Sequence, residues 1–91
     1  MSDNTTRYHL VPDVLMRSFD DIGLLVNLES DQVYELNETG ARVVELLDGT
    51  RTVDALIGAL AAEYEADEAA LRQDVEALLV RLVAQGLIAA G

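Results

Sequence analysis

Residues 24–49, LLVNLESDQVYELNETGARVVELLDG, decide the fold, because the spacing of their apolar side chains changes from two residues to about 3.6 within a few positions. The first half alternates apolar and polar residues around a polar turn at residues 29–31, as a half-buried hairpin does; the alternating apolar residues are Val26, Leu28, Tyr34 and Leu36. Helical spacing follows, in Val43, Val44, Leu46 and Leu47, and Asp48-Gly49 is a typical stop. We therefore predict two strands that run directly into a helix capped by Asn37.

The residues before this stretch predict one further strand. Pro12 opens residues 13–19, in which Val14 and Met16 alternate with Leu15 and Arg17. Short turns between consecutive strands favour an antiparallel meander of three strands. Residues 1–12 are expected to be a flexible segment, and residues 13–91 a single domain.

Two more helices are predicted after Gly49. Thr52 is a suitable cap for VDALIGALAAEYE, residues 53–65, whose apolar residues share one face. Asp67 is a suitable cap for a longer helix that ends near Gly86 and carries an apolar stripe of Leu71, Val75, Leu78 and Leu82. Three strands followed by three helices make an α+β fold, with the helices covering the sheet.

The charge of the chain restricts the partners that it can bind. Seventeen Asp and Glu residues stand against six Lys and Arg, all of them Arg, and the net charge is −11. Affinity for nucleic acid depends on cations that neutralise phosphates, so neither nucleic acid nor an anionic membrane is an expected partner. The chain has no run of about twenty apolar residues and no basic, apolar start typical of a signal peptide, which predicts a cytoplasmic protein.

No arrangement of residues indicates catalysis. Cysteine is absent and His9 is the only histidine, so neither a thiol nucleophile nor a zinc site can be assembled. The carboxylates lack calcium-loop spacing, and the six glycines form no phosphate-binding loop. We expect a protein that is not an enzyme and that has no catalytic residues, metal or cofactor.

The third predicted strand, Gln32 to Leu36, suggests a binding function. It is an edge strand without Pro or Lys, so its unpaired backbone groups could accept a peptide as an added strand, or a second copy of the chain in a homodimer. Leucines of the last helix could wall a groove beside it, although most of them are expected to be core. A winged-helix DNA-binding protein is an alternative, but the last helix carries only Arg72 and Arg81 against four acidic residues. A structural subunit or a fragment of a larger synthetase is another.

Several short motifs in this order resemble the PqqD-like family, also called the RiPP recognition element. They are LNETG at residues 36–40, DG at 48–49 followed by RTV at 51–53, and Asp74-Val75 with Leu78, Leu82 and Gly86-Leu87. The resemblance covers residues 13–89 and implies a winged-helix-like fold that binds the leader segment of a ribosomally made precursor peptide. Carried over, the peptide-binding residues are Gln32, Val33, Tyr34, Glu35 and Leu36 on the strand and Leu71, Asp74, Val75 and Leu78 on the last helix.

The resemblance also implies partner enzymes, which differ between two pathways. The free-standing recognition proteins of lasso-peptide clusters work with a leader peptidase and a cyclase. A PqqD proper works with a radical SAM enzyme in the synthesis of pyrroloquinoline quinone, as a peptide chaperone. Gly40 and Leu47 stand where we would expect Ala and Cys in a PqqD proper, which favours the lasso pathway or a generic member of the family and keeps the quinone pathway as the alternative.

Overall fold

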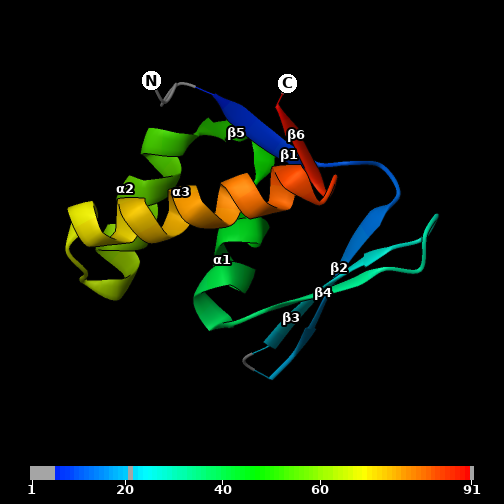
Figure 1. Ribbon diagram of the computed structural model, residues 1–91. Coiled ribbons are helices and arrows are strands. Elements are labelled where there is room, and N and C mark those ends of the chain that lie inside the picture. Colours follow the sequence, from blue (N-terminus) through cyan, green and yellow to red (C-terminus); the bar gives the residue numbers. More distant parts are fainter. Residues whose placement is uncertain (1–5, 21, 91) are drawn as a thin grey trace.

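The chain folds into two three-stranded sheets and three helices in a computed structural model that describes residues 6–20 and 22–90. Figure 1 shows the two sheets at opposite ends of the molecule, with the helices between them. The elements are β1 (Arg7–Leu10), β2 (Val14–Phe19), β3 (Ile22–Asn27), β4 (Val33–Leu36), α1 (Glu38–Leu46), β5 (Asp48–Thr52), α2 (Val53–Tyr64), α3 (Glu68–Ala84) and β6 (Ile88–Ala90).

The predicted meander is confirmed as the sheet β2-β3-β4, in which both strand pairs are antiparallel. The Asn27 side chain accepts backbone N–H groups of Glu29 and Ser30 at 2.9 and 3.2 Å, which fixes the turn. On β3, however, the alternation has the opposite phase: Leu25 is fully buried, whereas Leu28 lies in the turn and is 58% exposed. The run Leu24-Leu25-Val26 is apolar throughout, so its pattern could not decide which residue faces the core.

The second sheet, in the order β5-β1-β6, was not predicted. Residues 7–10 of the segment 1–12, which the sequence predicts to be flexible, form β1, and β1 is the central strand of this sheet and pairs with β5 and with β6. Tyr8 and Leu10 also pack against the core, so β1 is held by side chains as well as by backbone pairing. Residues 1–5 of the expected segment lie outside the described residues.

The three helices begin at the predicted caps. The Asn37 side chain accepts the Gly40 N–H at 2.8 Å at the start of α1. Thr52 and Asp67 make the equivalent bonds, of 3.1 and 3.3 Å, at the starts of α2 and α3. Each bond satisfies one backbone donor that a helix N-terminus leaves without a partner, and this confirms all three caps. None of the helices in the described ranges combines the length and apolar character needed to cross a membrane.

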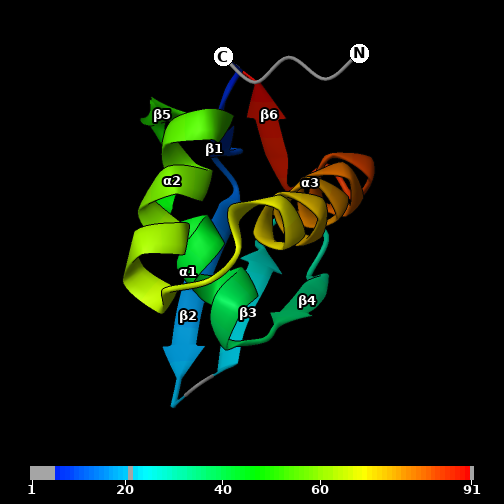
Figure 2. The ribbon, with the colours of Figure 1, turned by 90° about the vertical axis from the view of Figure 1, so that its left-hand side faces the viewer.

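Helix α1 occupies the centre of the molecule and contacts both sheets and both other helices (Figure 2). It approaches β3 closely at Gly23, where an added Cβ would lie only 2.8 Å from the Cβ of Ala41. The predicted stripe of α3 is buried, and Leu87 and Ile88 after it fold back into the core. The largest fully buried side chains are Leu25, Leu56, Ile57, Leu60, Leu82, Leu87, Val43 and Val75. The expected α+β class, with a three-stranded antiparallel sheet and three helices, is thus confirmed.

Candidate functional site

A groove of about 450 Å³ lies between the edge strand β4 and helix α3. We call it the β4–α3 groove. One wall comes from β4 and the start of α1, and the other from the middle of α3. Its lining residues are Tyr34, Glu35, Leu36, Asn37, Thr39, Gly40, Val43, Asp74, Val75, Ala77, Leu78 and Arg81.

Along this groove, β4 presents backbone groups that its sheet does not use. Strand β4 is the last strand of β2-β3-β4, and its register pairs Tyr34 with Leu25 and Val33 with Val26. Asn27 N–H donates to the Gln32 carbonyl at 2.9 Å, which places the hydrogen-bonded pairs at every second residue from Gln32 onward. Val33 and Glu35 therefore direct their N–H and C=O groups to the outer edge, where another strand could pair with them.

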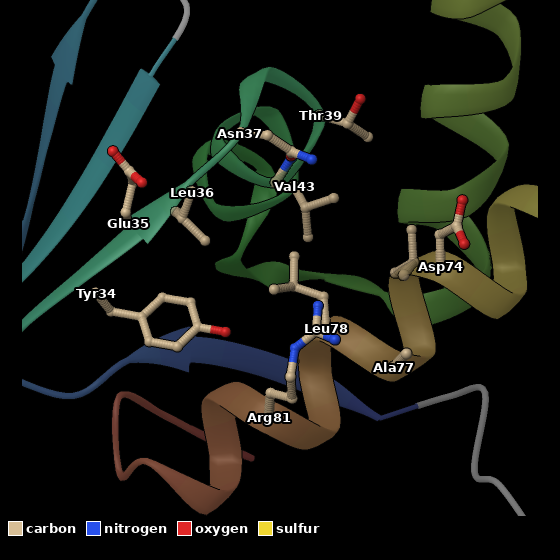
Figure 3. Close-up of a pocket in the computed structure, with 12 residues that line it drawn as sticks. Tyr34, Glu35, Leu36, Asn37, Thr39, Val43, Asp74, Ala77, Leu78 and Arg81 are labelled. Carbon is tan, nitrogen blue, oxygen red and sulfur yellow. The ribbon is translucent and has the colours of Figure 1, made fainter.

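The side chains of β4 divide between the two faces of its sheet. Figure 3 shows Tyr34 and Leu36 pointing from β4 toward α3, and Glu35 pointing the opposite way. Leu36 is buried and Tyr34 is half-buried, so the strand contributes an apolar and aromatic surface to the groove. An extended ligand in the groove would meet this surface with every second side chain.

The wall formed by α3 has a buried part and an exposed part. Val75 and Leu78 are 1% and 8% exposed, so they belong to the core and present only a small area to the groove. Asp74, Ala77 and Arg81 are exposed on the same wall. The buried apolar residues therefore shape the floor, and Asp74 and Arg81 offer polar contacts to a ligand.

Six of the nine residues expected to bind a peptide line the groove, namely Tyr34, Glu35, Leu36, Asp74, Val75 and Leu78. The other three do not: Gln32 lies at one end, Val33 contributes its outward backbone, and Leu71 is buried outside the lining. The sequence did not predict the remaining lining residues, which are Asn37, Thr39, Gly40, Val43, Ala77 and Arg81. One signal was available for Arg81, because it follows Asp74 by seven residues and so shares its helix face.

The two arginines of α3 have different surroundings. Arg72 bonds to Asp54 of α2 at 2.8 Å and to Glu68 at 3.4 Å, and these carboxylates, Asp54 first, raise the pKa of Arg72. Arg81 takes part in no ion pair within the described ranges. Since Arg72 is already neutralised, α3 has little positive charge for a phosphate backbone, which does not favour the DNA-binding alternative.

One end of the groove is closed by a hydrogen bond between its walls. The Gln32 side-chain amide donates to the Gln85 side-chain oxygen at 2.9 Å, which joins the start of β4 to the C-cap of α3. The bond is exposed to solvent, so its strength is modest. From this end Tyr34 and Arg81 come first along the two walls, and Thr39 and Asp74 lie at the other end (Figure 3), so β4 and α3 run in opposite directions along the groove.

Comparisons with known proteins identify relatives of this chain. The family model described as Coenzyme PQQ synthesis protein D (PqqD) matches residues 23–88. A curated relative from Rhodopseudomonas palustris strain TIE-1, named PqqA binding protein, is 38% identical over 63 residues, which are 69% of this chain and 62% of that protein. The chain thus spans less than two thirds of the length of that relative.

Two solved structures share the fold. TbiB1 in complex with the TbiA(beta) leader peptide is 24% identical, with a TM-score of 0.78, over 88% of this chain and 93% of that one. A lasso peptide synthetase B1 complexed with the leader peptide is also 24% identical, with a TM-score of 0.80, over 91% and 98%. At this level of identity the likeness concerns the fold.

Proposed function

This chain belongs to the PqqD family, and on that basis we propose that it binds the leader segment of a ribosomally made precursor peptide as an added strand on β4. The observation that carries the proposal is the outer edge of β4, where Val33 and Glu35 present unpaired backbone groups beside the β4–α3 groove. Peptides recognised in this way gain affinity from main-chain hydrogen bonds and specificity from alternate side chains.

The groove supplies the second part of such a binding mode. A strand added to β4 directs every second side chain toward α3 and the others toward the opposite face of the sheet. The first set would meet the half-buried Tyr34 above a floor shaped by Leu36 and Leu78, and we propose this surface as the apolar anchor. Asp74 and Val75 contribute at the far end. Gln32 and Leu71 lie outside the lining, so they would affect the peptide only by positioning the residues beside them.

We propose that the protein is a binding partner, not a catalyst, and that it presents the precursor to a modifying enzyme. A relative named PqqA binding protein and the two fold relatives with leader peptides support this role. The enzyme would be a leader peptidase and cyclase in the lasso pathway, or a radical SAM enzyme in the quinone pathway. A cytoplasmic location goes with the proposal, because ribosomal precursors are made there.

Gly40 bears on the choice between the two pathways. A Cβ at this position would lie 3.2 Å from the Asn37 side-chain oxygen and 3.4 Å from Leu36 Cδ2. The alanine expected in a PqqD proper would therefore press on the cap at the end of the groove. Glycine at this position is a departure from the residue expected in a PqqD proper, and our preference for a lasso-type leader rests on that departure, whereas the relative named PqqA binding protein keeps the quinone pathway as the alternative.

Calorimetric titration tests the proposal. The probes are synthetic PqqA and the leader peptides encoded by short reading frames beside the gene. We expect one of them to bind one-to-one and a scrambled version not to bind. A folded protein that binds none of these peptides would refute the proposed function. Sedimentation of the free protein would show whether the same edge joins two copies in a homodimer, as the open edge suggests.

Two proline variants test the binding mode itself. Glu35→Pro removes one outward N–H from the β4 edge. We expect it to weaken binding about tenfold, because this corresponds to the largest net free energy that one ordinary hydrogen bond contributes. Ser18→Pro is the matched control, because β2 is the opposite edge and the pairing of Leu28 N–H with the Asp13 carbonyl leaves Ser18 facing outward. Glu35→Ala retains the N–H and should bind like the parent. Equal loss of binding in both proline variants would exclude strand addition at β4.

A further inference from the structure

Two charged side chains of opposite sign line the β4–α3 groove from the same helix. Asp74 and Arg81 are seven residues apart on α3, so they lie on one face and about 10.5 Å apart along the helix axis. Glu35, the other charged lining residue, points to the opposite face of the sheet (Figure 3). A peptide in the groove would therefore meet one negative and one positive side chain.

Arg81 is available to a ligand. Its side chain extends from α3 into the space between α3 and β4 in Figure 3, and it is exposed. It takes part in no ion pair within the described residues, although the chain carries seventeen acidic side chains that could have neutralised it. A protein with a net charge of −11 repels acidic peptides in general, so an exposed cation in the groove favours an acidic residue at one defined position.

The closed end of the groove fixes the order of the two charges. Gln32 and Gln85 are bonded at the end where β4 begins, and Arg81 is one turn of α3 from that bond. Asp74 lies two turns further, on the side of Thr39 after the end of β4 (Figure 3). A strand antiparallel to β4 would therefore pass Asp74 first and Arg81 second. Antiparallel pairing is slightly more stable than parallel pairing and is commoner.

We infer that the groove selects a leader segment with a basic residue that contacts Asp74 and, two or four positions later, an acidic residue that contacts Arg81. The inference rests on the proposed function. Side chains on one face of a strand recur about every 6.8 Å, so the distance between Asp74 and Arg81 lies between the spans of two and four residues. The flexible Arg81 side chain can bridge either difference. Asp74 and Arg81 are thus specificity-determining residues, beside the apolar anchor.

A peptide-display selection tests the inference even where the sequence of the leader is unknown. The probe is a library of random twelve-residue peptides, selected separately against the parent protein, Arg81→Glu and Asp74→Arg. With the parent we expect enrichment of a basic residue followed, two or four positions later, by an acidic one. Arg81→Glu should change the acidic position to Lys or Arg, and Asp74→Arg should change the basic position to Asp or Glu.

The matched controls make the same charge changes away from the groove. Arg17→Glu lies on the outer face of β2, opposite Leu24, and Asp13→Arg lies before β2. Both should select the same peptides as the parent. For a selected peptide, Arg81→Glu should weaken binding about tenfold, and exchanging the acidic residue of the peptide for Lys should restore it.

Each outcome of the selection is informative. Identical charge preferences in the parent and in both groove variants, with circular dichroism showing all of them folded, would overturn the inference and leave the proposed function intact. An acidic residue that precedes the basic one would overturn the antiparallel order. Failure of every folded variant to select any peptide would instead count against the proposed function.

Discussion

Replacing Gly23 by alanine probes the contact on which the central helix depends. A Cβ at Gly23 would lie 2.8 Å from Ala41 Cβ and 3.4 Å from Ala41 Cα, well inside the optimal carbon separation of about 3.5–4.0 Å. Overpacking of this kind costs about 1–3 kcal/mol, and the lower entropy of the unfolded alanine chain offsets about 0.4–1 kcal/mol. We expect Gly23→Ala to lower the free energy of unfolding by about 1–2 kcal/mol, and the Tm by about 5–15 °C.

Urea unfolding followed by circular dichroism measures this change, and the chain provides a control of opposite sign. Gly58 is exposed on α2, and a Cβ there would meet no atom within 4 Å. We expect Gly58→Ala to stabilise the protein by about 0.5–1 kcal/mol, because glycine is unfavourable inside a helix. Ala41→Gly places a glycine inside α1 and should cost stability in the parent, but it should cost about 1–2 kcal/mol less beside Gly23→Ala, and this difference is the coupling energy of the two sites. If Gly23→Ala were as stable as the parent, or if the double-mutant cycle gave no coupling energy, α1 would not pack on β3 as described.

Three further substitutions or deletions test other parts of the fold by the same unfolding assay. Asn37→Ala removes the cap that accepts the Gly40 N–H, and we expect a loss of about 1 kcal/mol; Asn37→Ser, which can still cap, should lose less. Deleting residues 1–10 removes the central strand β1, and we expect the free energy of unfolding to fall by about 3 kcal/mol or more. An unchanged free energy of unfolding would show that these residues behave as the flexible segment that the sequence predicts. Hydrogen bonds from the Thr50 hydroxyl and N–H, then the charge of Arg51, hold the pKa of Asp48 below its ordinary value of 3.8. The ionised carboxylate therefore stabilises the fold above that pH, and this contribution disappears as the pH falls through the lower pKa of the folded state. Between about pH 5 and 2 the free energy of unfolding should fall less in Asp48→Asn than in the parent. An equal fall in the two proteins would contradict this.

The elements that the sequence predicted well are those whose signals are local. The residues that predict the Asn37 cap, or the apolar stripe of α3, lie within a few helical turns of one another in the sequence, and the structure confirms both predictions. The phase of β3 was lost because three successive apolar residues, Leu24 to Val26, carry no alternation. The position of the turn did not show which residues of β3 face the core either, because the apolar Leu28 fits the pattern of a strand but lies in the turn.

The second sheet was missed because its evidence is non-local. Strands β1, β5 and β6 are three to five residues long and come from the start, middle and end of the chain. Each is too short to show a period, and each is stable only through its partners. The groove also combines local and non-local signals. The β4 edge was predicted from one continuous stretch of sequence, whereas Arg81 belongs to the site only because β4 and α3 lie side by side.

The pairing of β1 with β6 also determines how this fold can be combined with others. Tyr8 lies opposite Ala90, so the chain enters and leaves the described fold at neighbouring points of one sheet. A unit with such adjacent ends can be inserted into a surface loop of a host protein without pulling apart the two stems of that loop. None of the residues that line the β4–α3 groove belongs to β1 or β6, so joining a host polypeptide to these two strands changes no lining residue. The same geometry suits circular permutation, in which a short linker joins the two ends and new ends open in the turn after Leu28.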